Sequence, residues 1–280
     1  IWKEVKSMTL NCNGKILDLS TKKIMGIVNV SNDSFYDGGQ YNSIDKVNSR
    51  INDLVSDGAE IIDIGAASSK PGSKLINAEE ELKIISDYII EISNNFRDIH
   101  LSIDTYNSDV AEFALAKGFS IINDISSGKY DPKMYDVIKE YNSGYVMMHM
   151  QGDPYNMQDN PEYDNVVESI ISFFRGKINE LENSGIQNII LDPGFGFGKT
   201  IQDNFKILKD LSLFQSFNKP LLVGLSRKSM IYKFLNTSPA EALNGTTALN
   251  TLAIDKGADI LRVHDAKEAS ECIKLLENLN

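Results

Sequence analysis

The chain has 280 residues, of which 42% are hydrophobic and 24% are charged, a composition typical of a globular protein with a full core. Its formal net charge of −11 at pH 7 argues against a general binder of nucleic acid or of anionic membranes, because such binders need a basic face. An anionic substrate is still compatible with this charge if a few cations are concentrated in one cleft.

No apolar run reaches the length of a membrane span, and the first residues lack the charged-then-apolar layout of a signal peptide. The two cysteines, Cys12 and Cys272, stand near opposite ends of the chain and are typical of buried thiols in a reducing compartment. We therefore expect a cytoplasmic protein with no nucleic-acid or membrane partner. Because the chain begins with Ile, an upstream fused domain stays open.

Eight short runs rich in β-branched residues predict strands that are buried on both faces. They cover 24–30, 60–65, 100–104, 120–124, 144–150, 188–192, 220–224 and 259–265. Amphipathic segments between them predict helices, among them 77–95, 107–117, 162–184 and 240–256, and glycines often follow these segments, as at helix C-termini.

Eight evenly spaced βα units predict an α/β fold, a single (β/α)8 TIM barrel; a doubly wound open sheet is the alternative. The segment 9–20 is expected to form a β-hairpin that covers the bottom of the barrel. The predicted organisation is an N-terminal lead and hairpin at 1–23, followed by the barrel at 24–280.

Polar residues follow or end all eight predicted strands. They are Asn29, Asp63, Asp104, Asn123, Asp124, His149, Asp192, Arg262, His264 and the run Ser226-Arg227-Lys228. A single such residue is better explained as the N-cap of the next helix. Because the C-terminal ends of barrel strands meet at one mouth, the whole set predicts a ligand site there.

The residue types indicate what this site binds. Arg262 and His264 stand two apart on one strand and so face the same way, and with Lys228 they form a cationic corner suited to phosphate. Asp104, Asn123 and Asp192 supply hydrogen-bond acceptors and one amide. A carboxylate can accept two parallel N–H bonds, so these three residues suit the amino-oxo edge of a guanine-like or pterin-like ring.

Two other single residues have plainer explanations. A lone histidine on an apolar strand, such as His149, is more often a hydrogen-bonded core residue than a catalyst, and we leave it out of the site. Arg227 can equally be an outward-facing partner in a salt bridge.

Two glycine-rich stretches need an explanation. LDPGFGFGKT (191–200) ends like a nucleotide-binding P-loop, but Pro193 stands where that motif needs its first glycine. We expect Lys199 and Thr200 to begin the next helix instead. NVSNDSFYDGG (29–39) is either a long surface turn or a functional loop, and loops of this length in compact barrels favour function.

The motifs NVSNDSFYDGG, DIGAASSKPG, SIDT, IIND, LDPGFGFGKT, GLSRKS and RVHD resemble, in order and spacing, those of the dihydropteroate synthases. The resemblance runs from about the first barrel strand to the C-terminus. It implies a homodimeric barrel, a transferase of folate biosynthesis, and condensation of 4-aminobenzoate with (7,8-dihydropterin-6-yl)methyl diphosphate, with Mg²⁺ as cofactor. Sulfonamides block this step in the family.

The resemblance also assigns roles to residues. It implies pterin binding by Asp104, Asn123, Asp192 and Lys228, and diphosphate binding by Asn29, Arg262 and His264, with Asn29 also reaching Mg²⁺. It places Asp33 on the catalytic loop. The 4-aminobenzoate pocket would be formed by Phe35, Ser69, Lys70, Pro71, Phe197 and Ser229.

Two loops depart from the family pattern. The second loop usually reads Gly-Glu-Ser-Thr-Arg-Pro, and here it reads Ala-Ala-Ser-Ser-Lys-Pro at 66–71. Lys70 keeps the positive charge but lacks the bidentate fork of an arginine. The first loop has Ser31-Asn32 where Thr-Pro is usual. We expect altered 4-aminobenzoate affinity and, because the second loop resembles the drug-insensitive branch of the family, reduced sulfonamide sensitivity.

Three other functions are alternatives to the dihydropteroate synthase reaction. A barrel that moves a methyl group from a folate to a corrinoid would share the pterin residues but would not need Lys228, Arg262 and His264 together. A non-catalytic homologue would not need intact ring and phosphate residues. A Schiff-base aldolase using Lys228 is chemically conceivable, but a lysine beside phosphate-binding cations is better explained as a hydrogen-bond donor.

Overall fold

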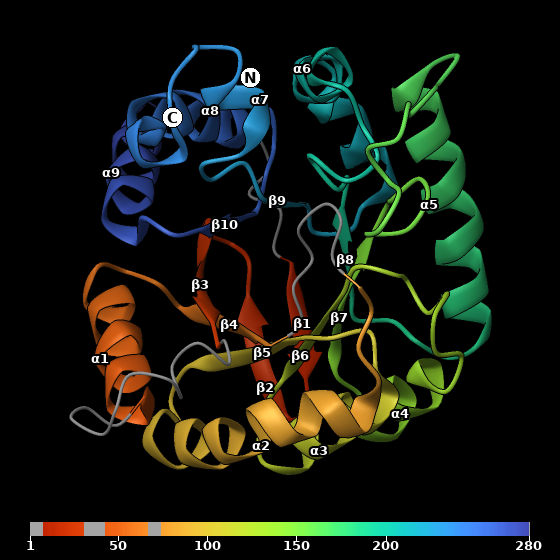
Figure 1. The fold of residues 1–280 in the computed structure, drawn as a ribbon, viewed down its shortest axis with the longest axis vertical. Coiled ribbons are helices and arrows are strands. Elements are labelled where there is room, and N and C mark those ends of the chain that lie inside the picture. Colours follow the sequence, from red (N-terminus) through yellow and green to blue (C-terminus); the bar gives the residue numbers. More distant parts are fainter. Residues whose placement is uncertain (1–7, 31–42, 67–73, 280) are drawn as a thin grey trace.

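The computed structural model describes residues 8–30, 43–66 and 74–279. Eight parallel strands occupy the centre of the molecule, and helices cover their outer faces (Figure 1). The strand order in the sheet is β8-β7-β6-β5-β4-β3-β10-β9. The strands are β3 Lys23–Asn29, β4 Ile61–Gly65, β5 His100–Asp104, β6 Ile121–Asp124, β7 Gly144–Met148, β8 Ile189–Asp192, β9 Leu222–Val223 and β10 Ile260–Val263.

The sheet closes on itself between its two outermost strands. A parallel bridge joins Leu191 to Leu221, and the Leu191 N–H donates a hydrogen bond of 2.8 Å to the Pro220 carbonyl. The predicted TIM barrel is thus confirmed, and the open-sheet alternative is wrong. Strand β9 is shorter than predicted, and Pro220, which has no N–H for the ladder, lies just outside it.

The helices are α1 Ser43–Ser56, α2 Ala78–Asn95, α3 Ser108–Ala116, α4 Met134–Tyr141, α5 Val166–Asn183, α6 Ile201–Lys209, α7 Ser229–Tyr232, α8 Leu243–Asp255 and α9 Ala266–Glu277, with 3-10 turns η2 Leu211–Phe217 and η3 Pro239–Glu241. The four predicted helical segments correspond to α2, α3, α5 and α8. Helix α5 begins later than predicted because Asn165 caps it, its side chain accepting a bond from Val167 N–H.

Glycines end several of these helices as predicted. Gly58, Gly118, Gly185 and Gly257 have φ between 88° and 105°. This left-handed backbone favours glycine over any residue with a Cβ atom, which explains why the sequence marks these helix ends.

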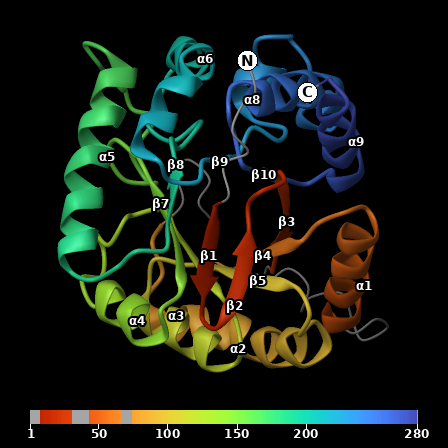
Figure 2. The ribbon, with the colours of Figure 1, turned by 180° about the vertical axis from the view of Figure 1, so that it is seen from behind.

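The N-terminal hairpin covers the opening at the N-terminal ends of the barrel strands and stands in front of them at the centre of Figure 2. Strands β1 Thr9–Cys12 and β2 Lys15–Asp18 pair antiparallel. The buried side chains of Leu10, Cys12, Leu17 and Leu19 pack on inward-facing barrel residues that include Met25 and Val146. Burying each such leucine side chain contributes about 2 kcal/mol. The predicted hairpin and its place are therefore confirmed, and both cysteines are buried and unbridged in the described part of the chain.

Candidate functional site

Polar side chains replace apolar ones inside the barrel toward the C-terminal ends of its strands. On four strands an isoleucine lies in the apolar layer beside the hairpin, and the residue two positions later is polar. These pairs are Ile61 and Asp63, Ile121 and Asn123, Ile190 and Asp192, and Ile260 and Arg262. Residues two apart on a strand share a face, so each polar residue also lies inside the barrel, nearer its mouth.

Asp63 on β4 is the centre of this polar layer and is fully buried. Its carboxylate accepts hydrogen bonds from Ser102 Oγ at 2.6 Å, Asn123 Nδ2 at 2.9 Å and Arg262 Nε at 2.7 Å. The three donors come from β5, β6 and β10. Asp63 therefore ties three strands together across the interior and fixes the orientation of the Asn123 amide.

Arg262 bridges Asp63 and Asp104, since its Nη2 donates to Asp104 Oδ2 at 2.8 Å. Burial raises the pKa of Asp104 to about 7, with Arg262 opposing this shift and Asp63 adding to it. Burial disfavours the charge of Arg262, but Asp63 and Asp104 outweigh it and raise the pKa of Arg262 above its ordinary value. A phosphate at this site would share the Arg262 guanidinium with two carboxylates. The sequence did not indicate this pairing of Arg262 with Asp63 and Asp104.

Asp192 ends β8, and its Oδ1 accepts a 2.7 Å bond from Gly194 N–H. Burial raises its pKa, and the nearby charge of Lys228 opposes this. The Lys228 ammonium donates to the Phe195 carbonyl and stands 4.6 Å from the centre of the Phe197 ring. Burial lowers the pKa of Lys228 to about 8, with Asp192 opposing. The structure thus brings Asp192, Lys228 and Phe197 together, as predicted for neighbouring parts of one site.

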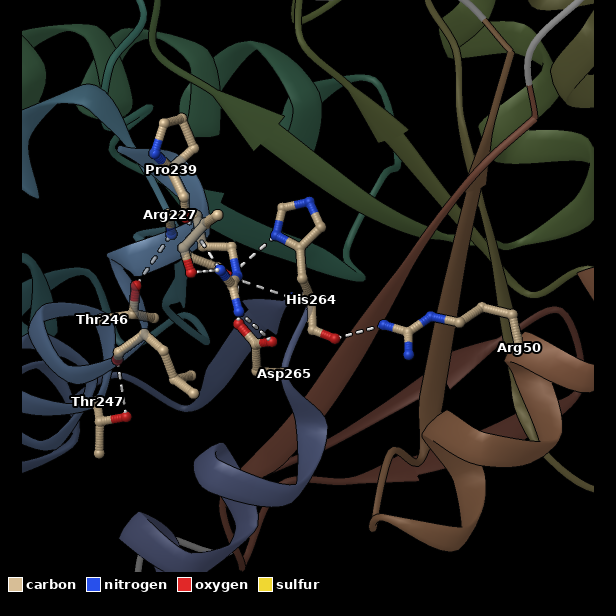
Figure 3. A network of polar contacts seen from close by, with 10 residues as sticks. Arg50, Arg227, Pro239, Thr246, Thr247, His264 and Asp265 are labelled. Carbon is tan, nitrogen blue, oxygen red and sulfur yellow. Dashed lines mark hydrogen bonds and ion pairs between the residues drawn. The ribbon is translucent and has the colours of Figure 1, made fainter. Parts of the chain in front are cut away.

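His264 lies just beyond the end of β10, and its Nδ1 is 3.0 Å from Ser226 Oγ. The same hydroxyl accepts the His264 N–H at 3.2 Å, and Arg50 on α1 donates to the His264 carbonyl (Figure 3). Burial lowers the pKa of His264 to about 4, and Arg262 adds to this effect. The imidazole is therefore neutral at pH 7 and is held by both its backbone and its ring.

Arg227 connects the loops after β9 and β10 (Figure 3). Its Nε and Nη2 form a bidentate pair with Asp265 at 2.8 and 2.9 Å, and Nη1 donates to the carbonyls of Pro239 and Ala240. Its backbone is left-handed, with φ of 54°. The interpretation of Arg227 as a salt-bridge partner is confirmed. The turn places its neighbours Ser226 and Lys228 at the site.

Three of the remaining predicted residues lie at the ends of strands or helices. Asn29 is exposed at the end of β3, and Ser229 begins α7 beside Lys228. Thr200 is confirmed as the N-cap of α6, where it forms a capping box with Asp203. Phe35, Asp33, Ser69, Lys70 and Pro71 lie outside the described residues.

Lys199 differs from its prediction as a plain helix start. Its ammonium is buried and donates to the carbonyls of His149, Gly194 and Phe197 at 2.8 to 3.1 Å. Burial lowers its pKa to about 7, with Asp192 opposing. Only the protonated amine supplies three N–H donors, so these three carbonyl oxygens favour the ammonium form and oppose the effect of burial.

His149 is buried and packs edge-on against Phe173, with ring centroids 5.2 Å apart. This packing among aromatic side chains agrees with the prediction that His149 is a core residue and not part of the site. The expectation that it is hydrogen-bonded is wrong for Nδ1, which has no partner within the described chain. Burial lowers its pKa to about 3, so the ring is neutral at pH 7.

The importance of Asp63 could have been inferred from its setting. It is the one charged residue in the strand IIDIG, and its neighbours Ile62 and Ile64 pack outward against the helices. An aspartate that alternates with outward-facing isoleucines must point into the barrel, where it needs donors. What the sequence does not contain is the identity of those donors.

The arrangement can recognise a flat, N–H-rich ring beside an anion. Asn123 and Asp192 supply buried acceptors and Asp104 a largely buried one, while Arg262, Lys228 and the neutral His264 supply donors. Within the described ranges no cluster of three or more histidine, cysteine, aspartate or glutamate side chains could form a metal cage of its own. None of the described helices combines the length and the apolar character needed to cross a membrane.

Comparison with known proteins adds independent findings. The family described as "Pterin binding enzyme" matches residues 25–264. The dihydropteroate synthase of Escherichia coli K12 is 41% identical over 272 residues, which cover 96% of each chain. The structure of the Yersinia pestis dihydropteroate synthase with a sulfonamide drug has a TM-score of 0.90 at 39% identity, covering 97% of this chain and 99% of that one. The Xanthomonas albilineans enzyme with 4-aminobenzoic acid has a TM-score of 0.89 at 34% identity, covering 98% of both.

Proposed function

Because the chain belongs to the pterin binding enzyme family, and within it to the dihydropteroate synthases, we propose the reaction that it catalyses. It condenses 4-aminobenzoate with (7,8-dihydropterin-6-yl)methyl diphosphate and releases 7,8-dihydropteroate and diphosphate. The observation that carries this proposal is the set of acceptors inside the barrel mouth, the buried Asn123 and Asp192 and the largely buried Asp104, next to Arg262 and Lys228.

The pterin ring is assigned to the acceptors. Asp192 has a raised pKa because it is buried, so a ring that donates N–H groups to it repays its desolvation. Burial raises the pKa of Asp104 to about 7, and donation from the ring favours its charged form. Lys228, over the Phe197 ring, stands at the edge of this pocket.

The diphosphate is assigned to Arg262, His264 and Asn29. Arg262 keeps its charge, and His264 can donate a hydrogen bond in its neutral form. Since Arg50 and Ser226 both hold His264, it needs little reorganisation when the anion arrives.

Mg²⁺ fits this arrangement as a proposed cofactor. It prefers oxygen ligands and is usually bound by one or two protein groups together with substrate phosphates. The exposed Asn29 amide oxygen at the end of β3 is such a group, and the described residues form no competing metal cage. When bound, the ion would neutralise charge on the leaving diphosphate.

The 4-aminobenzoate pocket is assigned to Phe197 and Ser229, together with Phe35, Ser69, Lys70 and Pro71 from the two loops. Phe197 is held beside Lys228, which gives the pocket one fixed apolar wall. Sulfonamides would compete for this pocket. We propose that Lys70, in place of the family's arginine, weakens their binding because it lacks a bidentate fork.

The bond changes follow from this placement. The C–O bond between the 6-methylene and the diphosphate breaks, and its electron pair leaves with the diphosphate. The aniline nitrogen donates its lone pair to the methylene, the C–N bond forms, and the nitrogen releases one proton to solvent. An aniline is neutral at pH 7, so no strong base is needed, and the chain's contribution is to orient both substrates and to stabilise the departing anion.

The competing functions fit less well. Lys228 has a lowered pKa, as a Schiff-base lysine would, but its ammonium is engaged by the Phe195 carbonyl and the Phe197 ring. Transfer of a methyl group to a corrinoid would not require Arg262, His264 and Lys228 together. A scaffold role would leave this buried charged layer without purpose.

A homodimer in the cytoplasm is proposed on family grounds. Exposed apolar side chains on the stretch from α7 to α8, including Phe234, Leu235 and Leu252, are the surface that supports association. The buried, unbridged Cys12 and Cys272 agree with a reducing compartment.

The test mixes purified protein with the dihydropterin diphosphate, 4-aminobenzoate and Mg²⁺ and follows diphosphate release. We expect turnover that depends on 4-aminobenzoate. Diphosphate release that does not respond to 4-aminobenzoate would refute the proposed reaction.

A further inference from the structure

The loop Gly194–Gly198, between β8 and α6, has each of its five carbonyl oxygens held by a side chain. Lys199 Nζ donates to Gly194 O at 2.9 Å and to Phe197 O at 2.8 Å. Lys228 donates to Phe195 O, Gln158 Nε2 to Gly196 O at 2.6 Å, and Tyr163 Oη to Gly198 O at 2.8 Å. We refer to these four side chains as the carbonyl clamp.

The loop also packs directly on the chain that follows β7. A Cβ atom at Gly194 would lie 2.0 Å from the His149 carbonyl oxygen, and one at Gly198 would lie 2.3 Å from the Gln151 carbonyl oxygen. Glycine is therefore required at both positions for the backbones to approach. Lys199 spans the same contact because it also donates to His149 O at 3.1 Å.

Lys199 is the central member of the clamp. It is 2% exposed, and its three N–H donors match three carbonyl oxygens, two on the loop and one on the neighbouring backbone. One of those oxygens belongs to Phe197, so the ammonium fixes the backbone from which the Phe197 ring projects. Asp192 lies at the end of β8, so the strand fixes its backbone.

We propose that the carbonyl clamp, with Lys199 at its centre, is a positioning device that sets the Phe197 wall for the second substrate. Lys199 contacts neither substrate; it acts through the loop. This inference rests on the proposed function, because the wall matters only if 4-aminobenzoate binds there. Loss of Lys199 from the clamp should affect 4-aminobenzoate more than the pterin, whose acceptors lie on strands.

The experiment compares wild type with Lys199→Met, and uses Lys209→Met as a control on the exposed surface of α6. Hydrogen exchange of the backbone amides in 193–199 is measured without substrates. KM and kcat are then measured with the dihydropterin diphosphate and 4-aminobenzoate. We expect Lys199→Met to speed exchange in this segment at least 10-fold. We also expect the KM for 4-aminobenzoate to rise at least 10-fold while pterin affinity changes less than 3-fold, with Lys209→Met like wild type.

A purely structural role gives a different result, and it would overturn the proposal. In that case the amount of folded protein and the apparent kcat fall together, while the KM for 4-aminobenzoate stays at the wild-type value. If Lys199→Met does not fold, Gln158→Ala decides, since Gln158 is exposed and its loss removes one clamp bond. Faster exchange with a raised KM supports the clamp, and unchanged exchange and KM refute it.

The two hypotheses fail separately. Wild-type protein that does not use 4-aminobenzoate contradicts the proposed reaction, whereas exchange measured without substrates still reports on the clamp. Wild-type turnover with an unchanged KM in the variants contradicts the clamp alone.

Discussion

Two layers of side chains fill the barrel on the same strands: an apolar lower layer beside the hairpin and a polar mouth layer at the C-terminal strand ends. They have opposite effects on stability. In the lower layer Ile61, Ile121, Ile190 and Ile260 pack on the N-terminal hairpin. Two residues further along each strand stand Asp63, Asn123, Asp192 and Arg262. The lower layer stabilises the fold by removing apolar surface from water, whereas burying charge in the mouth layer destabilises it. Stability and recognition are thus separated by one strand repeat, about 7 Å.

The largest effect is expected from Asp192→Ala in the mouth layer. It removes the acceptor assigned to the N–H groups of the pterin, and losing one partner of a buried charged hydrogen bond costs about 2–5 kcal/mol. Pterin affinity should fall at least 100-fold by calorimetry, because the N–H groups of the ring lose a buried acceptor. Unchanged pterin affinity would refute the role of Asp192.

The matched change in the lower layer is Ile190→Ala on the same strand. It leaves a cavity under the hairpin and should lower the unfolding free energy by about 2–5 kcal/mol, measured by denaturant titration. Activity per folded molecule should be near wild type. The control Ile16→Ala, at a side chain 60% exposed on the hairpin, should cost under about 0.5 kcal/mol. Loss of activity in folded Ile190→Ala would contradict the separation of the layers.

A smaller effect is expected from pH at the mouth. Burial raises the folded pKa of Asp104 to about 7, and an N–H donor on the ring favours its ionised form. Ring binding lowers this pKa and releases a proton, so affinity should rise by up to about 10-fold per pH unit below pH 7 and level off above it. Calorimetry with a pterin lacking the diphosphate measures this, and Asp104→Asn should remove the dependence. A flat profile in wild type would show that Asp104 is not the acceptor.

The smallest effect is expected from Lys70→Arg, which restores the family's residue. It should change the KM for 4-aminobenzoate and the sulfonamide inhibition constant several-fold, because the guanidinium can form two parallel bonds. Pterin affinity should stay within about 2-fold. A variant with altered pterin affinity and an unchanged KM would place Lys70 elsewhere in the site.

Much of the fold could be predicted because its signals are local. Strands buried on both faces are continuously apolar, helix ends carry glycine, and both features need only a few neighbouring residues. The polar strand ends were also visible, and the fold makes them converge. The helix starts were less certain, since Asn165 sets the start of α5 through a single side-chain bond.

The pairing inside the site could not be predicted in the same way. Arg262 pairs with Asp63, which lies 199 residues earlier, because β3 alone separates their strands in the closed sheet. Spacing along one strand predicts that Arg262 and His264 face the same way. It does not show that Arg262 also meets the carboxylates of Asp63 and Asp104 across the interior. Lys199 was missed because no pattern of residues shows that a lysine turns back onto its own loop.

For inhibitor chemistry, the carbonyl clamp determines what this wall of the pocket offers. The backbone oxygens of Gly194–Gly198 are already engaged by Lys199, Lys228, Gln158 and Tyr163. A compound that donates to them adds a second hydrogen bond to an oxygen that is already paired, and so gains less than it would from an unpaired acceptor. The productive contact is with the Phe197 ring, so on this wall of the pocket resistance to an inhibitor would have to arise from a change of that ring.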